Sequence, residues 1–455
     1  MAFPPAFLDE LNARNPIEDV VGQYVALTRR GSNLFGLCPF HGEKTPSFSV
    51  APEKGIFYCF GCHKGGGVVN FIMEIENLTY GDAVRFLAKR AGLEVPDDGA
   101  YQSQYKKKER LWALCRAAAQ FYHAQLKTPA GEEARAYLQK RGVSGQTVTR
   151  FGLGYSPNRW TALLDVMTAK GYTKEELLEA GLLSQNRDKG TLYDRFRNRL
   201  MFPIRNIRGQ VIAFSARTMI GEEPKYINTG DTPIFTKGSE VFGLYEARKS
   251  IQDKKRVIVV EGQMDVIQLS QAGFGEACAP LGTAIRAEHI ERLLKMTDHV
   301  IFSFDGDAAG RKAAKRAMDL SLPLLDDAQK VSFVFLPEGE DPDSLVKKSG
   351  APAFEEMLKK ALPLSSYLIE ALSQGLDLAV LEDRNAFIEE ASPLVRKTKS
   401  PLLRDGLIER LSTAVGYKNS DELRKYFGFP VLPPAAPQRP SGFGNQRYSF
   451  GRGYD

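Results

Sequence analysis

The chain has 455 residues, too many for one ordinary hydrophobic core, and this length suggests about two to four domains. Its 43% apolar and 25% charged residues are typical of a globular protein that folds in water. It has no apolar run of about 18 residues, which argues against a transmembrane helix, and Met1 to Leu11 lack the basic and apolar regions of a secretory signal. We therefore expect no membrane association and a cytoplasmic location, where thiols stay reduced.

The net charge of +6 is unevenly distributed along the chain. Residues 186–217 contain eight Lys or Arg and two Asp, an excess equal to that of the whole chain. A concentrated basic segment favours a phosphate-rich partner, although a solvated basic face gives the same pattern.

Changes in composition and periodicity divide the chain into successive parts, which together predict a multidomain α/β protein. Strands alternate with helices in residues 255–340, which indicates a mainly parallel sheet. The parts are a unit dense in aromatic residues, Gly and Cys (1–96), a polar linker (97–108), a helical segment followed by strands (109–250), the alternating unit (255–340), a second helical segment (341–427) and a Pro/Gly-rich tail that should be disordered (428–455).

Four residues of the first unit have the spacing of zinc ligands. Cys38 and His41 form one pair, Cys59 and Cys62 form another, and two residues separate the members of each pair. Such pairs let the side chains of a turn converge on one tetrahedral ion, and the long gap between the pairs suits a hairpin. Four nitrogen and sulfur ligands complete the coordination, so we expect one structural Zn²⁺. His63 is a rival ligand, but its position next to Cys62 suits the same tetrahedron poorly.

Aromatic and basic side chains surround the predicted zinc ligands. Aromatic rings stack on unpaired bases and cations follow a nucleic-acid backbone, but rings also build the small core that a zinc module needs. We expect most of the rings to be core, and one or two of them, with the lysines, to face DNA. The residues are Phe35, Phe40, Phe48, Phe57, Tyr58, Phe60, Arg29, Arg30, Lys44, Lys54 and Lys64.

Acidic residues follow the buried-type strands of the alternating unit. Glu261 follows the first strand, Asp265 lies one helical turn later, and Asp305 and Asp307 end the next. Ligands bind beyond the carboxyl ends of parallel strands, so these carboxylates should converge there. Because unpaired carboxylates repel one another, such a cluster normally holds a hard cation, and we expect a pair of Mg²⁺ ions serving phosphoryl chemistry. A further acidic group follows the third strand: Glu338, Glu340, Asp341 and Asp343.

Helix capping is the alternative for single members of this acidic group. Asp307 stands where it would cap a helix starting at Ala308, and Glu261 would serve as a turn residue. The sequence has no Gly-Lys-Ser of the P-loop type and suggests no nucleophile triad, which excludes a P-loop ATPase.

Several long motifs, in the same order along the chain, resemble those of the bacterial DnaG-type primase family. The resemblance covers residues 1 to about 427 and implies a CHC2-type zinc ribbon, a basic subdomain of a polymerase core, a Toprim catalytic domain and a helical subdomain. The motifs are CPFHGEKTPSFSV and FYCFGC for the zinc ribbon, VVEGQMDV, FSFDGDAAG and GEDPDSL for the Toprim domain, and YDRFRNRLMFPI and PKYINTGDTPIFTKG for the basic subdomain.

The resemblance also implies an activity, namely DNA-templated synthesis of short RNA primers from ribonucleoside triphosphates on single-stranded DNA. It implies two or more Mg²⁺ or Mn²⁺ ions. The catalytic, metal-binding acids would be Glu261, Asp305 and Asp307, supported by Asp265, Asp341 and Asp343. The template- and nucleotide-binding surface would include Arg141, Arg217, Lys225, Tyr226, Asn228 and Lys237.

Members of this family usually continue into a C-terminal helical domain that docks the replicative helicase. Here the segment after Phe427 is rich in Pro and Gly, which disfavour helices. We therefore expect the docking domain to be missing and the coupling to the helicase to be poor.

Two other classes stay open at this point. A RecR-type repair mediator also combines a zinc module with a Toprim unit, and a Toprim nuclease or topoisomerase would need a nucleophilic tyrosine or a cleavage metal site. The basic stretch from Arg195 to Lys237 favours the primase, since a mediator has no need of a nucleotide channel.

Overall fold

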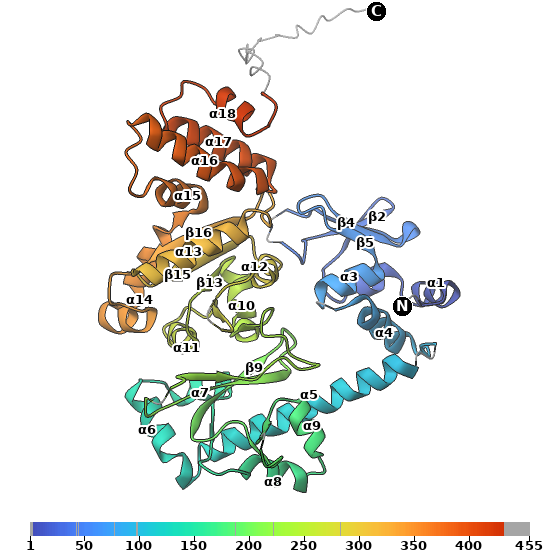
Figure 1. Cartoon of the computed structure of the whole chain (residues 1–455). Coiled ribbons are helices and arrows are strands. Elements are labelled where there is room, and N and C mark those ends of the chain that lie inside the picture. Colours follow the sequence, from blue (N-terminus) through green and yellow to red (C-terminus); the bar gives the residue numbers. More distant parts are fainter. Residues whose placement is uncertain are drawn as a thin grey trace, which may run out of the picture.

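The computed structural model describes residues 3–41, 43, 45–76, 78–96, 99–186, 188–221, 223–282 and 284–431, without the side chains of residues 99–102. Three parts follow one another along the molecule in Figure 1: a basic subdomain (residues 121–240), a central unit (241–363) and the C-terminal helices (364–427). The zinc unit (3–96) lies beside the central unit. None of the helices in the described part is both long and apolar enough to cross a membrane.

The zinc unit is an antiparallel sheet with the order β1-β2-β3-β4-β5, flanked by helices. Phe40, Phe48, Phe57 and Phe71 pack together in its core, with stacked Phe48 and Phe57 rings 5.3 Å apart. Three of the six predicted rings, Phe40, Phe48 and Phe57, are thus core, which is half of the set rather than most of it. The elements are α1 (Pro5–Arg14), α2 (Ile17–Val21), β1 (Thr28–Arg30), β2 (Asn33–Gly36), β3 (Phe48–Ala51), the 3-10 turn η1 (Pro52–Lys54), β4 (Ile56–Cys59), β5 (Gly65–Gly67), α3 (Val68–Ile75) and α4 (Tyr80–Ala91).

One long helix, α5 (Gly99–Gln125), connects the zinc unit to the basic subdomain (Figure 1). The predicted linker over residues 97–108 is helical from Gly99 onward, and residues 97 and 98 lie outside the described part. The second half of α5 carries Leu111, Leu114 and Cys115 into the core of the basic subdomain. Helix growth from an anchored segment is cooperative, and Gln, Lys and Glu are good helix formers, so the polar half continues the same helix without an apolar stripe.

The basic subdomain is built on an antiparallel sheet with the order β11-β10-β9-β6. Its two long strands, β9 (Arg199–Arg205) and β10 (Val211–Arg217), are the strand pieces predicted from the sequence. Their side chains are buried along almost their whole length because helices cover the sheet. The other elements are η2 (Pro129–Gly131), α6 (Glu132–Lys140), α7 (Gly145–Phe151), β6 (Gly154–Ser156), α8 (Ala162–Ala169), α9 (Lys174–Glu179), β7 (Leu183–Gln185), β8 (Leu192–Asp194) and β11 (Tyr226–Asn228).

The central unit has a sheet with the order β12-β14-β13-β15-β16-β17. Strands β14, β13, β15 and β16 run parallel, as predicted, and the edge strands β12 and β17 are antiparallel. The elements are β12 (Val241–Phe242), α10 (Leu244–Lys254), β13 (Val257–Val259), α11 (Gln263–Gln271), β14 (Ala277–Pro280), α12 (Ala287–Leu294), β15 (His299–Phe304), α13 (Ala308–Ser321), β16 (Lys330–Phe335), α14 (Pro342–Lys359) and β17 (Leu362–Pro363).

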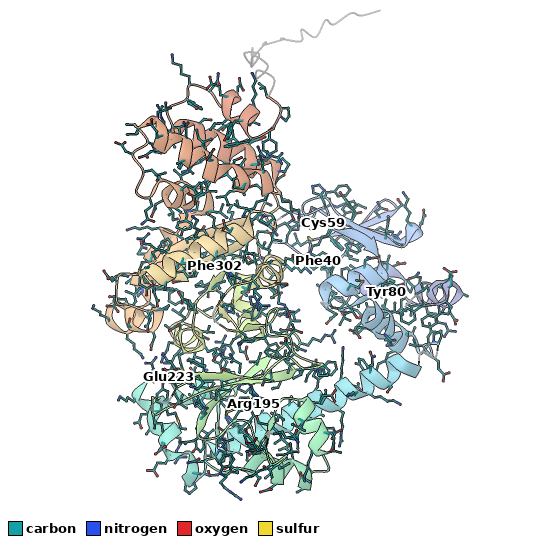
Figure 2. The ribbon with its side chains drawn as sticks, viewed as in Figure 1. Phe40, Cys59, Tyr80, Arg195, Glu223 and Phe302 are labelled. Carbon is teal, nitrogen blue, oxygen red and sulfur yellow. The ribbon has the colours of Figure 1, made fainter. Side chains whose placement is uncertain are left out.

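Alternate residues of the central strands face opposite sides of the sheet. Val259 and Phe302, the latter labelled in Figure 2, belong to the core that also contains residues of the C-terminal helices. Ile258 and Ile301 belong to the core shared with the basic subdomain. The two faces of the sheet thus contribute to two different hydrophobic cores. The C-terminal helices are α15 (Leu364–Ser373), α16 (Leu381–Lys397), α17 (Pro401–Ala414) and α18 (Asp421–Tyr426), and the tail predicted over 428–455 lies outside the described residues from position 432 onward.

Candidate metal centres and nucleic-acid interface

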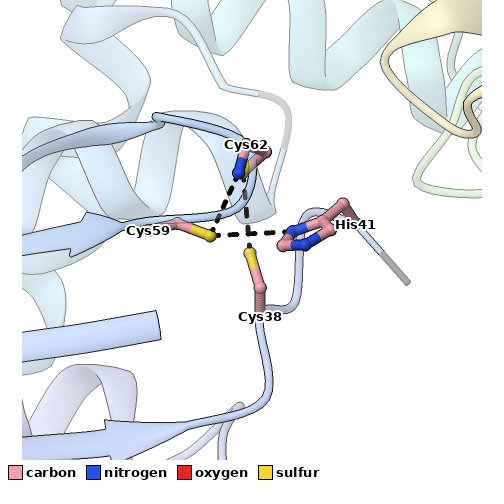
Figure 3. Close-up of side chains that lie close together, drawn as sticks. All are labelled: Cys38, His41, Cys59 and Cys62. Carbon is pink, nitrogen blue, oxygen red and sulfur yellow. Dashed lines mark hydrogen bonds between the residues drawn. The ribbon is translucent and has the colours of Figure 1, made fainter. Parts of the chain in front are cut away.

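The predicted zinc ligands converge in one place. The ligand atoms of Cys38, His41, Cys59 and Cys62 all lie within 4.8 Å of one another (Figure 3). Cys38 Sγ is 3.8 Å from Cys62 Sγ, and Cys59 Sγ is 3.7 Å from His41 Nδ1. Zinc–sulfur bonds of about 2.3 Å in a tetrahedron separate two sulfurs by about 3.8 Å, so this geometry fits Zn²⁺. These four residues form the zinc site.

His63, the rival ligand, is held elsewhere. Its Nδ1 lies 2.9 Å from the hydroxyl of Tyr58, and its backbone has a positive φ of 58°. The turn instead directs two backbone N–H groups at Cys59 Sγ, from Gly61 at 3.3 Å and Cys62 at 3.4 Å. Such hydrogen bonds stabilise a thiolate, the form of cysteine that binds metal.

Glu43 and Ser47 support the zinc site, and neither was predicted from the sequence. The Glu43 carboxylate accepts hydrogen bonds from the backbone N–H of Cys38 at 2.7 Å and of Ser47 at 3.0 Å, and it lies 3.3 Å from His41 Nε2. The Ser47 hydroxyl contacts Cys59 Sγ at 3.2 Å. A carboxylate on the second ring nitrogen fixes the orientation of a metal-bound histidine.

Tyr58 and Phe60 are the rings of the predicted set that are most exposed, and they contact each other edge to face with centroids 5.1 Å apart. They lie beside the zinc turn and are available for stacking. Lys64 is engaged by Glu74 at 2.9 Å and lies over the Phe40 ring. Lys44, also predicted to face DNA, lies outside the described residues.

The predicted acids lie at the carboxyl ends of three adjacent parallel strands of the central unit. Glu261 follows β13, Asp305 and Asp307 follow β15, and Asp341 and Asp343 follow β16. The pairing of β13 with β15 and of β15 with β16 makes these ends neighbours. Asp265 joins them from the first turn of α11. We refer to this set as the acid edge.

The carboxylates of the acid edge raise one another's pKa by charge repulsion. Burial, together with the charges of Asp341, Asp305 and Asp343, raises the pKa of Asp265 to about 7. Burial and the charges of Asp341 and Asp307 likewise raise the pKa of Asp305, and burial and the charge of Asp305 raise that of Glu261. Within the described part of the chain, no Lys or Arg forms an ion pair with Glu261, Asp265, Asp305 or Asp307. The charge and ligand type of this set suit a hard divalent cation. Its carboxylate oxygens are not drawn together as the zinc ligands are, since among the described residues only the zinc ligands form a group within 4.8 Å of one another.

Two of these acids are helix caps as well. Asp307 Oδ1 accepts the N–H of Gly310 at 2.7 Å and starts α13, and Asp341 Oδ1 accepts the N–H of Ser344 at 2.6 Å and starts α14. The capping alternative is therefore correct in geometry, but each cap uses only one of the two carboxylate oxygens. A cap and a metal ligand are compatible at the same residue.

Glycines allow the acid-bearing loop to lie close to the neighbouring strand end. A Cβ at Gly306 would stand 2.2 Å from the carbonyl oxygen of Leu336, and one at Gly310 would stand 2.1 Å from that of Asp305. Both obstacles are backbone atoms, which cannot move aside as a flexible side chain does. Taken alone, the two glycines had little predictive value, yet the Asp-Gly-Asp turn depends on both.

Asp343 differs from the other acids because two cations hold it. Its carboxylate lies 2.9 Å from Arg141 Nη2 and 2.7 Å from Lys347 Nζ, and the residue is only 4% exposed. Gln268 fixes the backbone of Arg141 by donating to its carbonyl at 2.6 Å. The predicted phosphate-binding arginine is thus anchored at the acid edge. Glu340 is occupied by Lys348 at 2.6 Å, and Glu338 is exposed.

Arg217 and Tyr226 also lie near the acid edge. They face each other in the register of β10 and β11, and Arg217 Nη1 donates to the Tyr226 hydroxyl at 3.2 Å. Burial and the charge of Asp265 raise the pKa of Tyr226, which is about 12, while the charge of Arg217 lowers it. The guanidinium of Arg217 also lies 5.4 Å from the centre of the Tyr137 ring.

The remaining residues of the predicted surface are more dispersed. Lys225 is exposed just before β11, and the carbonyl of Asn228 at the end of β11 accepts from Arg195 Nη2 at 2.9 Å. Arg195 is labelled in Figure 2 within the basic subdomain. Lys237 lies on the loop between β11 and β12, against Gly282 at the end of β14.

An exposed aromatic and arginine cluster of the basic subdomain was not predicted. Trp160 is 64% exposed and meets Tyr193 edge to face with centroids 5.4 Å apart. The guanidinium carbon of Arg197 lies 4.1 Å from the centre of the Trp160 ring and 5.0 Å from that of Tyr193. Asp194 fixes this arrangement, since its N–H donates to the Trp160 carbonyl at 2.7 Å and its own carbonyl accepts from Arg197. We call Trp160, Tyr193 and Arg197 the aromatic platform.

Four family models match the chain in succession. They are described as a CHC2 zinc finger (residues 3–103), the N-terminal domain of the DNA primase catalytic core (121–248), a Toprim domain (255–335) and the DnaB-helicase binding domain of primase (365–416). The last match coincides with α15, α16 and α17. The expectation that a helicase-docking domain is missing is therefore wrong. It was based on the Pro/Gly-rich tail, whereas the match lies in the helices before the tail.

Relatives and solved structures agree with these models. The chain is 44% identical to the DNA primase of Pseudomonas aeruginosa over 91% of its own length and 63% of that protein, so it spans less than two thirds of this relative. A solved DnaG primase catalytic domain bound to single-stranded DNA matches 70% of the chain and 99% of that structure with 39% identity and a TM-score of 0.66. The zinc-binding and RNA polymerase domains of Aquifex aeolicus primase match 93% of the chain and 99% of that structure with 33% identity and a TM-score of 0.61.

Two further relatives are covered over more of their length. The chain is 44% identical to the DNA primase of Neisseria meningitidis over 72% of that protein, and 40% identical to that of Escherichia coli K12 over 74%. With the zinc site and the Toprim sheet in place, this similarity means that the chain belongs to the DnaG-type family of DNA primases.

Proposed function

We propose that this chain is a DNA primase that synthesises short RNA primers on single-stranded DNA in preparation for replication. The observation that carries the proposal is the acid edge: carboxylates at three adjacent strand ends, free of ion pairs in the described part of the chain at Glu261, Asp305 and Asp307, beside the anchored cations Arg141 and Arg217. Acids without counter-ions next to ordered arginines suit a reaction between metal-bound phosphates.

Glu261, Asp305 and Asp307 would hold two or more divalent ions, Mg²⁺ or Mn²⁺, with Asp265 and Asp341 in support. Bound there, such ions would neutralise the phosphates and activate a 3′-hydroxyl toward an α-phosphate, with pyrophosphate leaving. Arg141 and Arg217 would orient the phosphates by charge-assisted hydrogen bonds. Asp343 would act through Arg141, because both its oxygens already contact cations.

The template would cross the basic subdomain. Rings of the aromatic platform suit unpaired bases, since every base has a face on which an aromatic side chain can stack, while Arg197, Arg195 and Lys225 suit the phosphates. The similar DnaG catalytic domain that was solved bound to single-stranded DNA supports this assignment. Exposed Tyr58 and Phe60 would let the zinc unit read the template as well.

We propose a replicative helicase as the partner of α15, α16 and α17, on the strength of the match to a helicase-binding family model. Helicase titrated against primer yield tests this. We expect several-fold stimulation that is weakened by Leu402→Glu, because Leu402 is the most exposed large apolar residue of these helices. If helicase does not stimulate primer synthesis, the assignment of the partner is contradicted. If stimulation is unaffected both by Leu402→Glu and by removal of residues 428–455, the assignment of the docking surface is contradicted.

A primer assay distinguishes this function from its rivals. The chain would be incubated with single-stranded DNA, labelled ribonucleotides and Mg²⁺, and the product treated with alkali. A repair mediator makes no product, and a nuclease or topoisomerase changes the DNA. A primase makes short, alkali-labile RNA, which Asp305→Asn should abolish.

A further inference from the structure

Two loops interlock at the carboxyl end of β14. Lys237 belongs to the loop before β12, and Arg286 directly precedes α12. A Cβ at Gly282 would stand 2.9 Å from Lys237 Cε and 3.3 Å from its Nζ, so the lysine lies across that glycine. A Cβ at Gly238 would stand 2.6 Å from Arg286 Nη1, so the arginine lies across the other. The first loop therefore supplies Lys237 and Gly238, and the second supplies Gly282 and Arg286. The cation of each loop lies against the glycine of the other.

These two cations have no anionic partner. Within the described residues, neither Lys237 Nζ nor Arg286 forms an ion pair, and the nearby Glu240 is occupied by Arg292 at 2.7 Å. Arg316 adds a further positive charge, since its Nε donates to the carbonyl of Ile285 at 3.1 Å. Placing like charges together is unfavourable unless an anion joins them. The arrangement is the counterpart of the acid edge, with the opposite sign.

A buried histidine supports the main chain of Arg286. His289 is 0% exposed, and its Nδ1 accepts the backbone N–H of Arg286 at 3.1 Å. Burial lowers the pKa of His289, and the Lys237 carbonyl opposes that effect. Because Nδ1 accepts a hydrogen bond, the proton of the neutral ring lies on Nε2, which has no hydrogen-bond partner within the described residues. The His289 side chain thus fixes the main chain that carries Arg286.

The position of this pair relative to the acid edge is set by the sheet. β14 is adjacent to β13, whose end carries Glu261, and β15, whose end carries Asp305 and Asp307, comes next. Neighbouring strands lie about 4.8 Å apart, so the end of β14 is roughly 10 Å from the end of β15. The distal phosphates of a triphosphate whose reacting phosphate lies at the acids extend part of the way across this distance, and the long Lys and Arg side chains cover the rest.

We propose that Lys237 and Arg286 form a clamp for the distal phosphates of a ribonucleoside triphosphate, with His289 as the residue that positions Arg286. The proposal rests on the proposed function. The family resemblance implied a nucleotide-binding role for Lys237 alone, so Arg286 and His289 are new members of the site. The clamp selects triphosphates, because a monophosphate held at the acid edge does not reach it.

Calorimetric titration of the full, zinc-loaded chain with inorganic tripolyphosphate, in excess Mg²⁺, tests the clamp. The unmodified chain should bind tripolyphosphate more tightly than orthophosphate. Arg286→Ala should weaken tripolyphosphate binding about tenfold, the effect of losing one charge-assisted hydrogen bond, and Arg286→Lys should restore part of it. Lys295→Ala is the matched control, since it removes one exposed charge from the opposite end of α12 and should leave the affinity within about twofold.

Three results would overturn the clamp: no binding of tripolyphosphate, equal binding of tripolyphosphate and orthophosphate, or equal affinities of Arg286→Ala and Lys295→Ala. Melting temperatures of all variants show whether a loss of tripolyphosphate affinity comes from unfolding. If Arg286→Ala is unfolded, Arg286→Lys tests the clamp instead, because it keeps the charge. The outcome is separable from the proposed function. A chain that binds tripolyphosphate through Arg286 yet makes no RNA keeps the clamp and loses the primase assignment.

Discussion

At the scale of single residues, the acid edge contains carboxylates in different states. One carboxylate oxygen of Asp307 accepts a hydrogen bond from the N–H of Gly310, whereas both carboxylate oxygens of Asp343 form ion pairs. Asp265 has no ion-pair partner in the described chain and has its pKa raised to about 7. The number of free oxygens, rather than position in the sequence, separates a candidate metal ligand from a residue that positions another.

Asp307→Asn removes the charge of this residue while its amide oxygen still caps α13. We expect primer synthesis to fall by about 100-fold or more, because a catalytic metal ion contributes several kcal/mol to the transition state. DNA affinity and melting temperature should stay nearly unchanged. Glu338→Gln is the matched control, since Glu338 is an exposed acid close to the same edge. Normal synthesis by Asp307→Asn would reduce Asp307 to a helix cap.

The raised pKa of Asp265 predicts a pH dependence. Its ordinary value is about 3.9, so the folded chain binds the proton more tightly than the unfolded chain between about pH 4 and 7. Without added Mg²⁺, this contribution to the free energy of unfolding is fully present below about pH 4 and is lost as the pH rises through about 7. Melting temperatures measured across this range should show the loss, and Asp265→Asn should flatten it. An identical pH profile for the variant would contradict the assignment.

Spacing along the sequence predicted the zinc ligands and placed the acids at strand ends, because both patterns are local. Glu43 and Ser47 escaped prediction, since nothing in the sequence says which polar residue of a loop turns toward a metal-bound histidine. The ion pair of Arg141 with Asp343 joins residues about 200 positions apart, and only the folded chain brings them into contact.

At the scale of secondary-structure elements, the aromatic platform joins a turn before α8 to β8 and the residues that follow it. Trp160 and Arg197 would contribute to DNA binding in different ways. Trp160→Ala should cost about 1–3 kcal/mol of single-strand affinity without changing its salt dependence, because stacking involves no counter-ion release. Arg197→Ala should reduce the slope of log affinity against log salt by about 0.7.

Fluorescence anisotropy with labelled single strands at several salt concentrations measures both effects. Tyr426→Ala provides the control, since this exposed aromatic lies on α18, far from the basic subdomain (Figure 1). If Trp160→Ala leaves the affinity unchanged, the template takes another path across the subdomain.

Periodicity predicted most elements of the central unit because strong apolar strands alternate there with helices ended by glycine. It failed at residues 99–108, which have no apolar stripe of their own. Their helix extends from the part of α5 that Leu111 and Leu114 anchor in a distant core, and that anchoring is tertiary. The aromatic platform was also not predicted. Trp160 and Tyr193 are 33 residues apart in the sequence, and the backbone contacts of Asp194 bring them together in the fold.

At the scale of the whole molecule, the C-terminal helices are not a separate body attached to the catalytic sheet. They share one core with Val259, Phe302 and Phe333 of the central strands. The sequence predicted these helices but carried no sign of this shared core, because helical periodicity identifies an apolar face and not its partner. The docking domain was expected to be missing for a related reason, since that expectation rested on the composition of the tail alone.

The shared core predicts coupled stability. Leu368→Ala, in the buried face of α15, should lower the free energy of unfolding by about 2–5 kcal/mol and reduce hydrogen-exchange protection in β15 as well as in α15. Leu402→Ala, at an exposed position of α17, is the control and should change neither. Unchanged protection of β15 in Leu368→Ala would mean that the helices unfold as an independent unit.

The central claim is that the acid edge synthesises RNA as directed by a DNA template, and product composition tests it most directly. The unmodified chain would be given single-stranded templates that differ in one run of bases, with all four ribonucleotides and Mg²⁺. The account predicts short, alkali-labile products whose composition follows each template by base pairing and which disappear when Mg²⁺ is removed. Products of the same composition on every template, or no RNA on any of them, would contradict it.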